Sequence, residues 1–95
     1  MRNRYLVAYD VSDDERRTAI FKTLMSNGDH VQLSVFLCDL SDVELARLRG
    51  QLAKAVNQRQ DQVIILSLGP AETSLASRLE CIGQAYAPPG RVQVI

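Results

Sequence analysis

The chain has 95 residues and a mass of 10.6 kDa, which fits one domain that a dimer interface would help to stabilise. Hydrophobic residues make up 46% of it and charged residues 23%, as in globular rather than disordered or fibrous proteins. Eleven basic and eleven acidic side chains cancel, which excludes binding to nucleic acid by bulk electrostatics and leaves only a local patch. Most of the basic residues are arginines, whose planar guanidinium is the better bidentate partner for phosphate.

The N-terminus and the cysteines indicate a protein of the cytoplasm with no membrane partner. The apolar stretch at residues 5–9 is shorter than the ~7 to 15 residues of a signal-peptide core. The densest apolar run, residues 63–66, falls far short of the ~18 residues of a membrane span. Cys38 and Cys81 have no His or Cys beside them, so we predict two buried free thiols rather than a zinc site or redox pair.

The first predicted element is a strand at residues 5–11, which is rich in aromatic and β-branched residues and has polar flanks. Ser12 followed by Glu15 has the pattern of a capping box. A helix is therefore predicted from about residue 13 to residue 26, ended by Asn27 and Gly28. Its core-facing side chains are expected to be Ile20, Phe21 and Leu24.

Residues 31–38 alternate with a period of two, which predicts a strand. One face would consist of Val31, Leu33, Val35 and Leu37. The other face contains Phe36 and Cys38 and therefore needs an apolar cover, for which a partner subunit is one candidate. Because no turn residue interrupts the stretch, it is either one long strand or a strand that bends into two pieces without a Gly or Pro.

A second helix is predicted to begin at residue 41. Ser41 and Glu44 repeat the capping-box pattern, and apolar residues then recur at helical spacing. The expected core face consists of Leu45, Leu48, Leu52 and Val56. Arg47 and Arg49 lie off this face.

The remaining elements are predicted to be strands. Residues 62–68 form a nearly unbroken apolar strand, residues 77–82 a weaker one, and residues 91–95 a short terminal strand in the tail at residues 88–95. Two helices on one face of a small antiparallel sheet predict an α+β sandwich of the ferredoxin-like kind, with residues 1–95 as a single domain.

Asp10 is the strongest candidate for chemistry, because it ends the first strand and precedes a helix. Aspartate is depleted within strands, whereas a carboxylate at a strand end can meet a ligand. The structural alternative is that Asp10 caps the helix or pairs with Arg16 or Arg17. A carboxylate and two guanidiniums near one helix N-terminus can hold a metal ion and phosphates. The acids at residues 13–15 suit the helix dipole and are interpreted as structural.

Two common site motifs are missing from the sequence. His30 is the one histidine and is expected to lie in a turn, so neither a catalytic triad nor a zinc site is predicted. The five glycines are scattered singly, which argues against a phosphate-binding glycine loop.

Four segments of the chain, in order and at family-like spacing, resemble the CRISPR-associated Cas-two family. The matching segments are YLVAYDVSDD with the arginine pair at residues 5–17, GDHVQLSVF with CDL at residues 28–40, DQVII at residues 61–65 and LGP at residues 68–70. The resemblance implies a ferredoxin-like homodimer whose C-terminal strand pairs across to the partner. It also implies a divalent-metal site at the dimer axis, with Mg²⁺ or Mn²⁺ bound by Asp10 of each subunit.

The same resemblance assigns further residues. Positions tied to nuclease function in some family members are matched by Tyr9, Arg17 and Phe36. Ser34 lies in the same signature. Leu37 stands where many members carry an acid, and Ala19 stands where some carry an arginine. Both departures weaken the nuclease interpretation more than they weaken the family assignment.

Nucleic acid is the implied substrate, either RNA or DNA. Its predicted binding patch consists of Arg16, Arg17, Arg47 and Arg49. Because the family joins the Cas-one integrase in capturing foreign DNA as spacers, the leading hypothesis is a metal-dependent endonuclease of spacer acquisition that cuts phosphodiesters with Mg²⁺-activated water. The alternatives are a non-catalytic dimeric adaptor that bridges the integrase and holds DNA, a ligand-binding regulator, and a toxin-like ribonuclease of the same fold.

Overall fold

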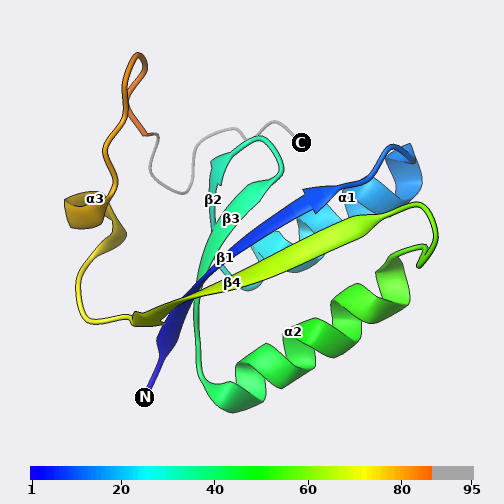
Figure 1. Cartoon of the computed structure of the whole chain (residues 1–95), viewed down its shortest axis with the longest axis horizontal. Helices are drawn as coiled ribbons and strands as arrows, with labels where there is room; N and C mark the ends of the chain where they lie inside the picture. The colour runs from blue at the N-terminus through cyan, green and yellow to red at the C-terminus, as the bar shows by residue number, and fades with distance from the viewer. Residues whose placement is uncertain (87–95) are drawn as a thin grey trace.

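The computed structural model describes residues 1–86. Its elements are β1 (Asn3–Asp10), α1 (Asp14–Met25), β2 (Asp29–Gln32), β3 (Val35–Leu40), α2 (Asp42–Ala55), β4 (Gln62–Pro70) and α3 (Leu75–Arg78). The strands form one antiparallel sheet in the order β2-β3-β1-β4, and α1 and α2 lie together on one side of it (Figure 1). This β-α-β-β-α-β arrangement confirms the predicted ferredoxin-like α+β fold. The predicted tail at residues 88–95 lies outside the described residues.

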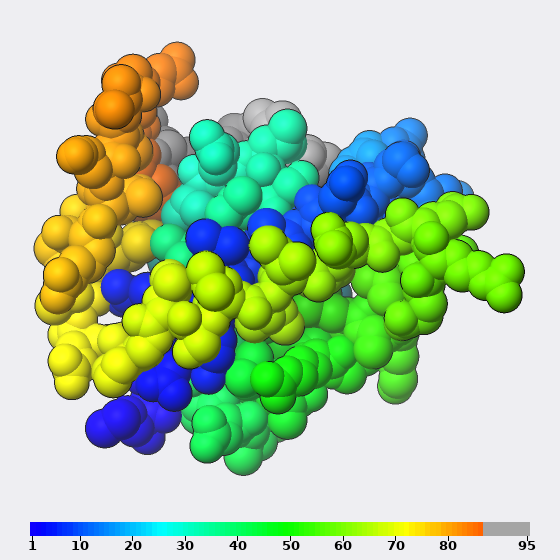
Figure 2. Space-filling view, in the orientation of Figure 1, coloured from blue at the N-terminus to red at the C-terminus, as the bar shows by residue number. Residues whose placement is uncertain are grey.

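Alternation along β1 gives the sheet two faces. The side chains buried against the helices are those of Tyr5, Val7 and Tyr9. Leu6, Ala8 and Asp10 point to the opposite side. We call this side the open face and define it by the apolar residues Leu6, Ala8, Val35, Leu37, Ile64 and Leu66. Figure 2 shows β4, in yellow-green, running along the surface beside the blue residues of β1.

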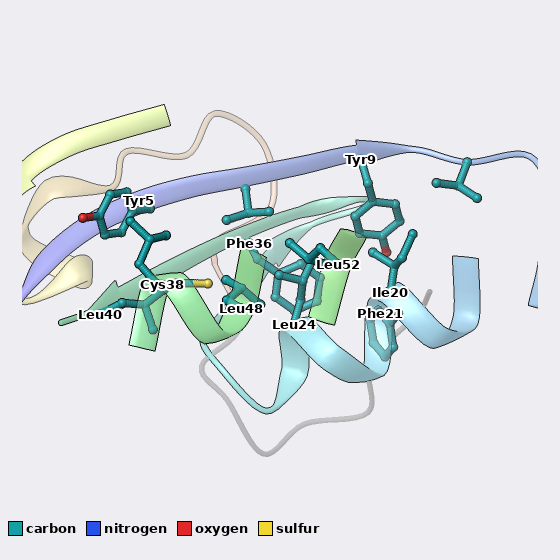
Figure 3. Packing of buried hydrophobic residues seen from close by; sticks show 13 residues of the cluster. Tyr5, Tyr9, Ile20, Phe21, Leu24, Phe36, Cys38, Leu40, Leu48 and Leu52 are labelled. Atoms are coloured by element: carbon teal, nitrogen blue, oxygen red, sulfur yellow. The ribbon is translucent and has the colours of Figure 1, made fainter. Parts of the chain in front are cut away.

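The hydrophobic core fills the space between the sheet and the two helices (Figure 3). Phe36 and Cys38 have no exposed surface and lie in the centre of it. The predicted helical faces are confirmed except at Val56, which follows α2 and is only partly buried. The buried residues of the two helices are Ile20, Phe21, Leu24, Leu45, Leu48 and Leu52. The helices of the same chain, not a partner subunit, therefore cover the face of β3 that carries Phe36.

The stretch at residues 31–38 is two strands joined by a tight turn. β2 ends at Gln32 and β3 begins at Val35, so the turn consists of Leu33 and Ser34. Ser34 has φ +64°, in the left-handed region that residues other than glycine rarely adopt. Its carbonyl oxygen accepts a hydrogen bond of 3.1 Å from the Tyr9 N–H of β1. The chain thus bends without Gly or Pro because a contact with β1 holds the turn.

Two local predictions near α1 are corrected. The N-cap is Asp13 rather than Ser12, because the Asp13 carboxylate accepts a hydrogen bond of 2.9 Å from the Arg16 N–H. His30 lies in β2 rather than in a turn, and its ring packs against that of Phe36 with centroids 4.8 Å apart. By contrast, the capping box predicted for α2 is present in full.

The segment after β4 differs from its prediction. Residues 77–82 are not a strand, because α3 takes up their beginning and no sheet strand within residues 1–86 pairs with the rest. Cys81 is consequently exposed rather than buried, whereas Cys38 is buried as predicted. Residues 79–86 lie over part of the open face and enclose with it a cavity of about 750 Å³. No helix within residues 1–86 is long and apolar enough to span a bilayer.

Gly28, between α1 and β2, provides a test of how closely this connection approaches β3. A Cβ atom added at Gly28 would lie 2.5 Å from both the Cys38 Sγ and the Leu37 carbonyl oxygen. Gly28→Ala is therefore expected to lower the free energy of unfolding by about 1 to 3 kcal/mol in urea titrations. Gly50→Ala is the matched control, because a Cβ there meets nothing within 4 Å and should add about 0.5 to 1 kcal/mol by its helix propensity. A Gly28→Ala protein as stable as the parent would contradict this packing.

Candidate functional site

Asp10 ends β1 with an exposed carboxylate on the same side as the open face. Within residues 1–86 this carboxylate has no hydrogen-bond or ion-pair partner. The two structural alternatives for Asp10 are filled by other residues, because Asp13 caps α1 and other acids pair with Arg16 and Arg17. Asp10 is thus available to a ligand.

Arg16, a predicted nucleic-acid contact, is held by Asp61. Its Nε and Nη2 donate to the two Asp61 oxygens at 2.7 and 3.1 Å. The Asn57 N–H donates to the same carboxylate at 2.7 Å. The Asp61 side chain has no exposed surface while that of Arg16 keeps 27%, so the pair lies in a shallow site just below the molecular surface. The pKa of Asp61 is lowered from its ordinary value, mainly by the hydrogen bonds from the Arg16 guanidinium and next by the one from the Asn57 N–H.

Arg17, a predicted catalytic and nucleic-acid-binding residue, lies against the turn that leaves β1. Its Nη1 donates to the carbonyl oxygens of Val11 and Ser12, each at 3.2 Å. Its Nη2 pairs with Asp14. Arg17 therefore contacts the connection between β1 and α1 directly, whereas the Arg16 side chain contacts Asp61, the residue before β4.

Tyr9 and Phe36, two further predicted catalytic residues, lie in the core. Tyr9 is 5% exposed and Phe36 is not exposed at all, and their rings stack with centroids 6.4 Å apart. The Tyr9 ring points from β1 toward Ile20 of α1 (Figure 3). Burial raises the pKa of the Tyr9 hydroxyl, and Ser34 and the charge of Arg17 oppose this shift only in part. Both rings lie on the helix side of the sheet, where they pack under the end of β1. Their position allows a packing role.

Arg47 and Arg49 differ from the first two arginines because both are exposed and have no side-chain partner within residues 1–86. They are two residues apart, so they point to different sides of α2. Arg49 borders a groove of about 310 Å³ between α2 and β4, which Val63 and Ile65 also line. The predicted patch thus contains two engaged and two free arginines, and its role in binding stays a prediction.

The described part of one chain, residues 1–86, does not provide a complete metal site. Within residues 1–86, no three side chains of His, Cys, Asp or Glu are grouped so that they could hold an ion. Mg²⁺ prefers six oxygen ligands and commonly takes one or two carboxylates, with waters and substrate phosphates completing the shell. Asp10 therefore fits a divalent cation only as one half of a shared site. Leu37, where many family members carry an acid, adds no oxygen ligand. It is the neighbour of Leu6 on the open face.

Asp61 has no role predicted from the sequence, although it lies in the DQVII segment that resembles the family. One local signal was present: Asp61 follows Asn57 by four residues, and Asn57 forms a turn with its Oδ1 accepting the Arg59 N–H at 2.9 Å. The partner Arg16 is 45 residues away, and no local pattern connects the two.

The fold and the site together define a ferredoxin-like sandwich with a free carboxylate at the edge of an apolar open face. A profile of the family described as CRISPR associated protein Cas2 matches residues 2–74. The chain belongs to this family, the one that the sequence resembles.

Curated relatives and solved structures agree with this assignment. A Geobacter sulfurreducens protein named CRISPR-associated endoribonuclease Cas2 is 36% identical over 95 residues, which cover 100% of this chain and 99% of the relative. A Thermus thermophilus protein named CRISPR-associated endonuclease Cas2 2 is 40% identical over 75 residues, 70% of this chain and 83% of the relative. The crystal structure of a hypothetical Thermus thermophilus protein matches with a TM-score of 0.75 and 34% identity, over 93% of this chain and 99% of that one. Streptococcus pyogenes Cas2 matches with a TM-score of 0.72 and 26% identity, over 84% and 99%.

Asp61 is expected to make stability depend on pH. Its folded pKa lies below the ordinary 3.8, so its stabilising effect is fully present above about pH 4 and is lost as the pH falls through the lowered value. Asp61→Asn should be less stable than the parent at pH 7, and in urea titrations the difference should narrow as the pH falls below about 4. Glu72→Gln, at an exposed acid, should follow the parental curve throughout. A difference that is constant with pH would contradict the lowered pKa.

Proposed function

We propose that this chain is a homodimeric nuclease of the spacer-acquisition stage of CRISPR immunity, which works in the cytoplasm with the Cas-one integrase and cuts phosphodiester bonds of RNA or DNA. The observation that carries the proposal is the exposed, unpartnered Asp10 carboxylate on the open-face side of the sheet. The names of the relatives, endoribonuclease and endonuclease, support cleavage of nucleic acid.

The homodimer is supported by the open face. Ile64 and Leu66 of β4 are 49% and 55% exposed, so apolar surface remains uncovered beside Asp10. β4 is also an edge strand of the sheet, and its outer backbone groups are available to a second chain. Two copies that meet by their open faces bring both Asp10 carboxylates to one interface, as a shared cation site requires.

Mg²⁺ or Mn²⁺ held between two Asp10 carboxylates would lower the pKa of a bound water and neutralise charge on the scissile phosphate. The residues of the chain hold Asp10 ready for that role. The β1–β4 ladder pairs Asp10 with Gln62, and the Tyr9 ring beneath fixes the end of the strand.

The dimer interface can be tested by placing a charge on it. Ile64→Arg and Leu66→Arg should each raise the dimer dissociation constant at least about 30-fold, an effect of about 2 kcal/mol or more, because the new charge would be buried. Sedimentation velocity at micromolar concentration measures the loss. Val43→Arg is the matched control, since Val43 is 67% exposed on α2. Dimers that persist with both open-face variants would place the interface elsewhere.

Asp10→Asn tests the proposed chemistry, because it nearly preserves shape while removing the charge that attracts a cation. Cleavage of an RNA or DNA oligonucleotide should fall at least ~100-fold, a barrier increase of about 2.7 kcal/mol. The dimer and its affinity for the oligonucleotide should remain, since Asp10 contacts no phosphate directly. Asp42→Asn, at an exposed acid of α2, is the control. Cleavage by Asp10→Asn at the parental rate would remove Asp10 from the mechanism.

The adaptor is a second candidate, favoured by the burial of Tyr9 and Phe36 and by the lack, within residues 1–86, of a group of three potential metal ligands. Spacer capture by the integrase with Asp10→Asn separates the two functions. Capture that persists would identify a scaffold whose nuclease activity is separable. Capture that fails while folding and complex formation stay intact would place Asp10 chemistry in the pathway.

A further inference from the structure

Asp61 joins three segments of the chain that meet beside Asp10. Its carboxylate accepts two hydrogen bonds from the guanidinium of Arg16, in the first turn of α1, and one from the backbone N–H of Asn57, after α2. The next residue, Gln62, begins β4 and is the cross-strand partner of Asp10. Asp61 is therefore one residue from the position that pairs with the candidate site.

The connection between Asp10 and α1 is held at both of its ends. At one end the β1–β4 ladder fixes Asp10 against Gln62. At the other end Arg16 contributes its backbone N–H to the Asp13 cap and its side chain to Asp61. A change in the Arg16–Asp61 pair would therefore move the first turn of α1 relative to β4, and the chain from Asp10 to Asp13 would move with it.

The donors of Arg16 are arranged for a protein partner rather than for a phosphate. Nε and Nη2, one of the two edges of the guanidinium that can bind an anion bidentately, both donate to Asp61, and Nη1 lies 3.8 Å from the Asp13 carboxylate. Nη2 also donates to the Gln60 Oε1 at 3.2 Å. A phosphate that binds the Nε and Nη2 edge would have to displace a carboxylate that has no exposed surface.

We propose that Arg16 and Asp61 form a positioning pair that fixes the Asp10 carboxylate for its ligand, and that Arg16 is not a nucleic-acid contact. The proposal rests on the function proposed above for the role of Asp10, but the pair itself can be tested without cleavage. Pre-organisation of this kind matters because small displacements of a reacting group lower the rate steeply.

The test is a double-mutant cycle with Arg16→Gln, Asp61→Asn and the double variant, in the full-length protein with Mg²⁺ and a single-stranded RNA oligonucleotide. Each single variant should lower kcat by about ten- to a hundred-fold with KM nearly unchanged. The kcat of the double variant should be no lower than that of the less active single variant, because the two residues act as one unit. Arg16→Lys should rescue little, since an ammonium cannot reproduce the bidentate fork.

Binding of the same RNA without metal, measured against salt, excludes the alternative role. If Arg16 contacts a phosphate, Arg16→Gln flattens the log–log salt slope by about 0.7, Arg16→Lys preserves it, and Asp61→Asn tightens binding by freeing the guanidinium. That pattern, or rate losses that multiply in the double variant, would overturn the proposal. The expected result is an unchanged slope in all the variants. Arg47→Gln serves as a comparison at an exposed, unpartnered arginine.

Amide hydrogen exchange keeps the proposal testable if the parental protein does not cleave RNA. In both single variants the amides of residues 16 and 17, which donate to the Asp13 carboxylate and carbonyl oxygens, should exchange at least about ten-fold faster, while those of the core strands keep their parental rates. Asp39→Asn is the matched control, since Arg4 grips Asp39 with Nε and Nη2 at 2.8 and 3.1 Å near the other end of β1. Unchanged exchange at residues 16 and 17 in both variants would overturn the positioning role whatever the outcome for the nuclease.

Discussion

The two-residue alternation of β1 is the constraint on which the rest of the molecule depends. Val7 and Tyr9 must enter the core, because Phe36 of β3 packs against the same layer and the helices close over it. Their burial directs Ala8 and Asp10 to the other side. A shift of one residue would exchange the two faces, exposing Tyr9 and burying a carboxylate. The exposure of Asp10 is therefore fixed by the hydrophobic core rather than by its own surroundings.

The parts of the fold that the sequence predicts are those with local causes. The capping box of Ser41 and Glu44 and the apolar faces of both helices depend on residues within a few positions of one another. The bend at Ser34 does not: a serine in the left-handed region costs about 1 to 3 kcal/mol, and tertiary contacts such as the hydrogen bond from Tyr9 offset it. Residues 77–82 look like a strand, but a strand needs a neighbour that only the folded sheet can supply or withhold.

In the candidate site, too, only the residue with a local signal could be predicted from the sequence. Asp10 could be predicted because an aspartate at the end of a strand is unusual in itself. The sequence also reveals the charge of Arg16, but it does not reveal which partner that charge will find. Asp61 is 45 residues away and meets Arg16 only because the start of β4 pairs with the end of β1, close to where α1 begins. An arginine that resembles a phosphate contact in the sequence can therefore be a structural residue in the fold.

Within residues 1–86, the free arginines of the predicted patch and the Asp10 carboxylate lie on different sides of the sheet. Arg16 and Arg17 are neutralised by acids of the same chain, which accounts for part of the overall charge balance. Of the four arginines predicted to bind nucleic acid, those that remain free, Arg47 and Arg49, lie on α2 in the helical layer. Asp10 lies on the side of the open face, across the sheet from that layer. If Arg47 and Arg49 bind nucleic acid as predicted, a nucleic acid held along α2 would not present the same phosphates to Asp10. Affinity and the proposed cleavage would then depend on different surfaces.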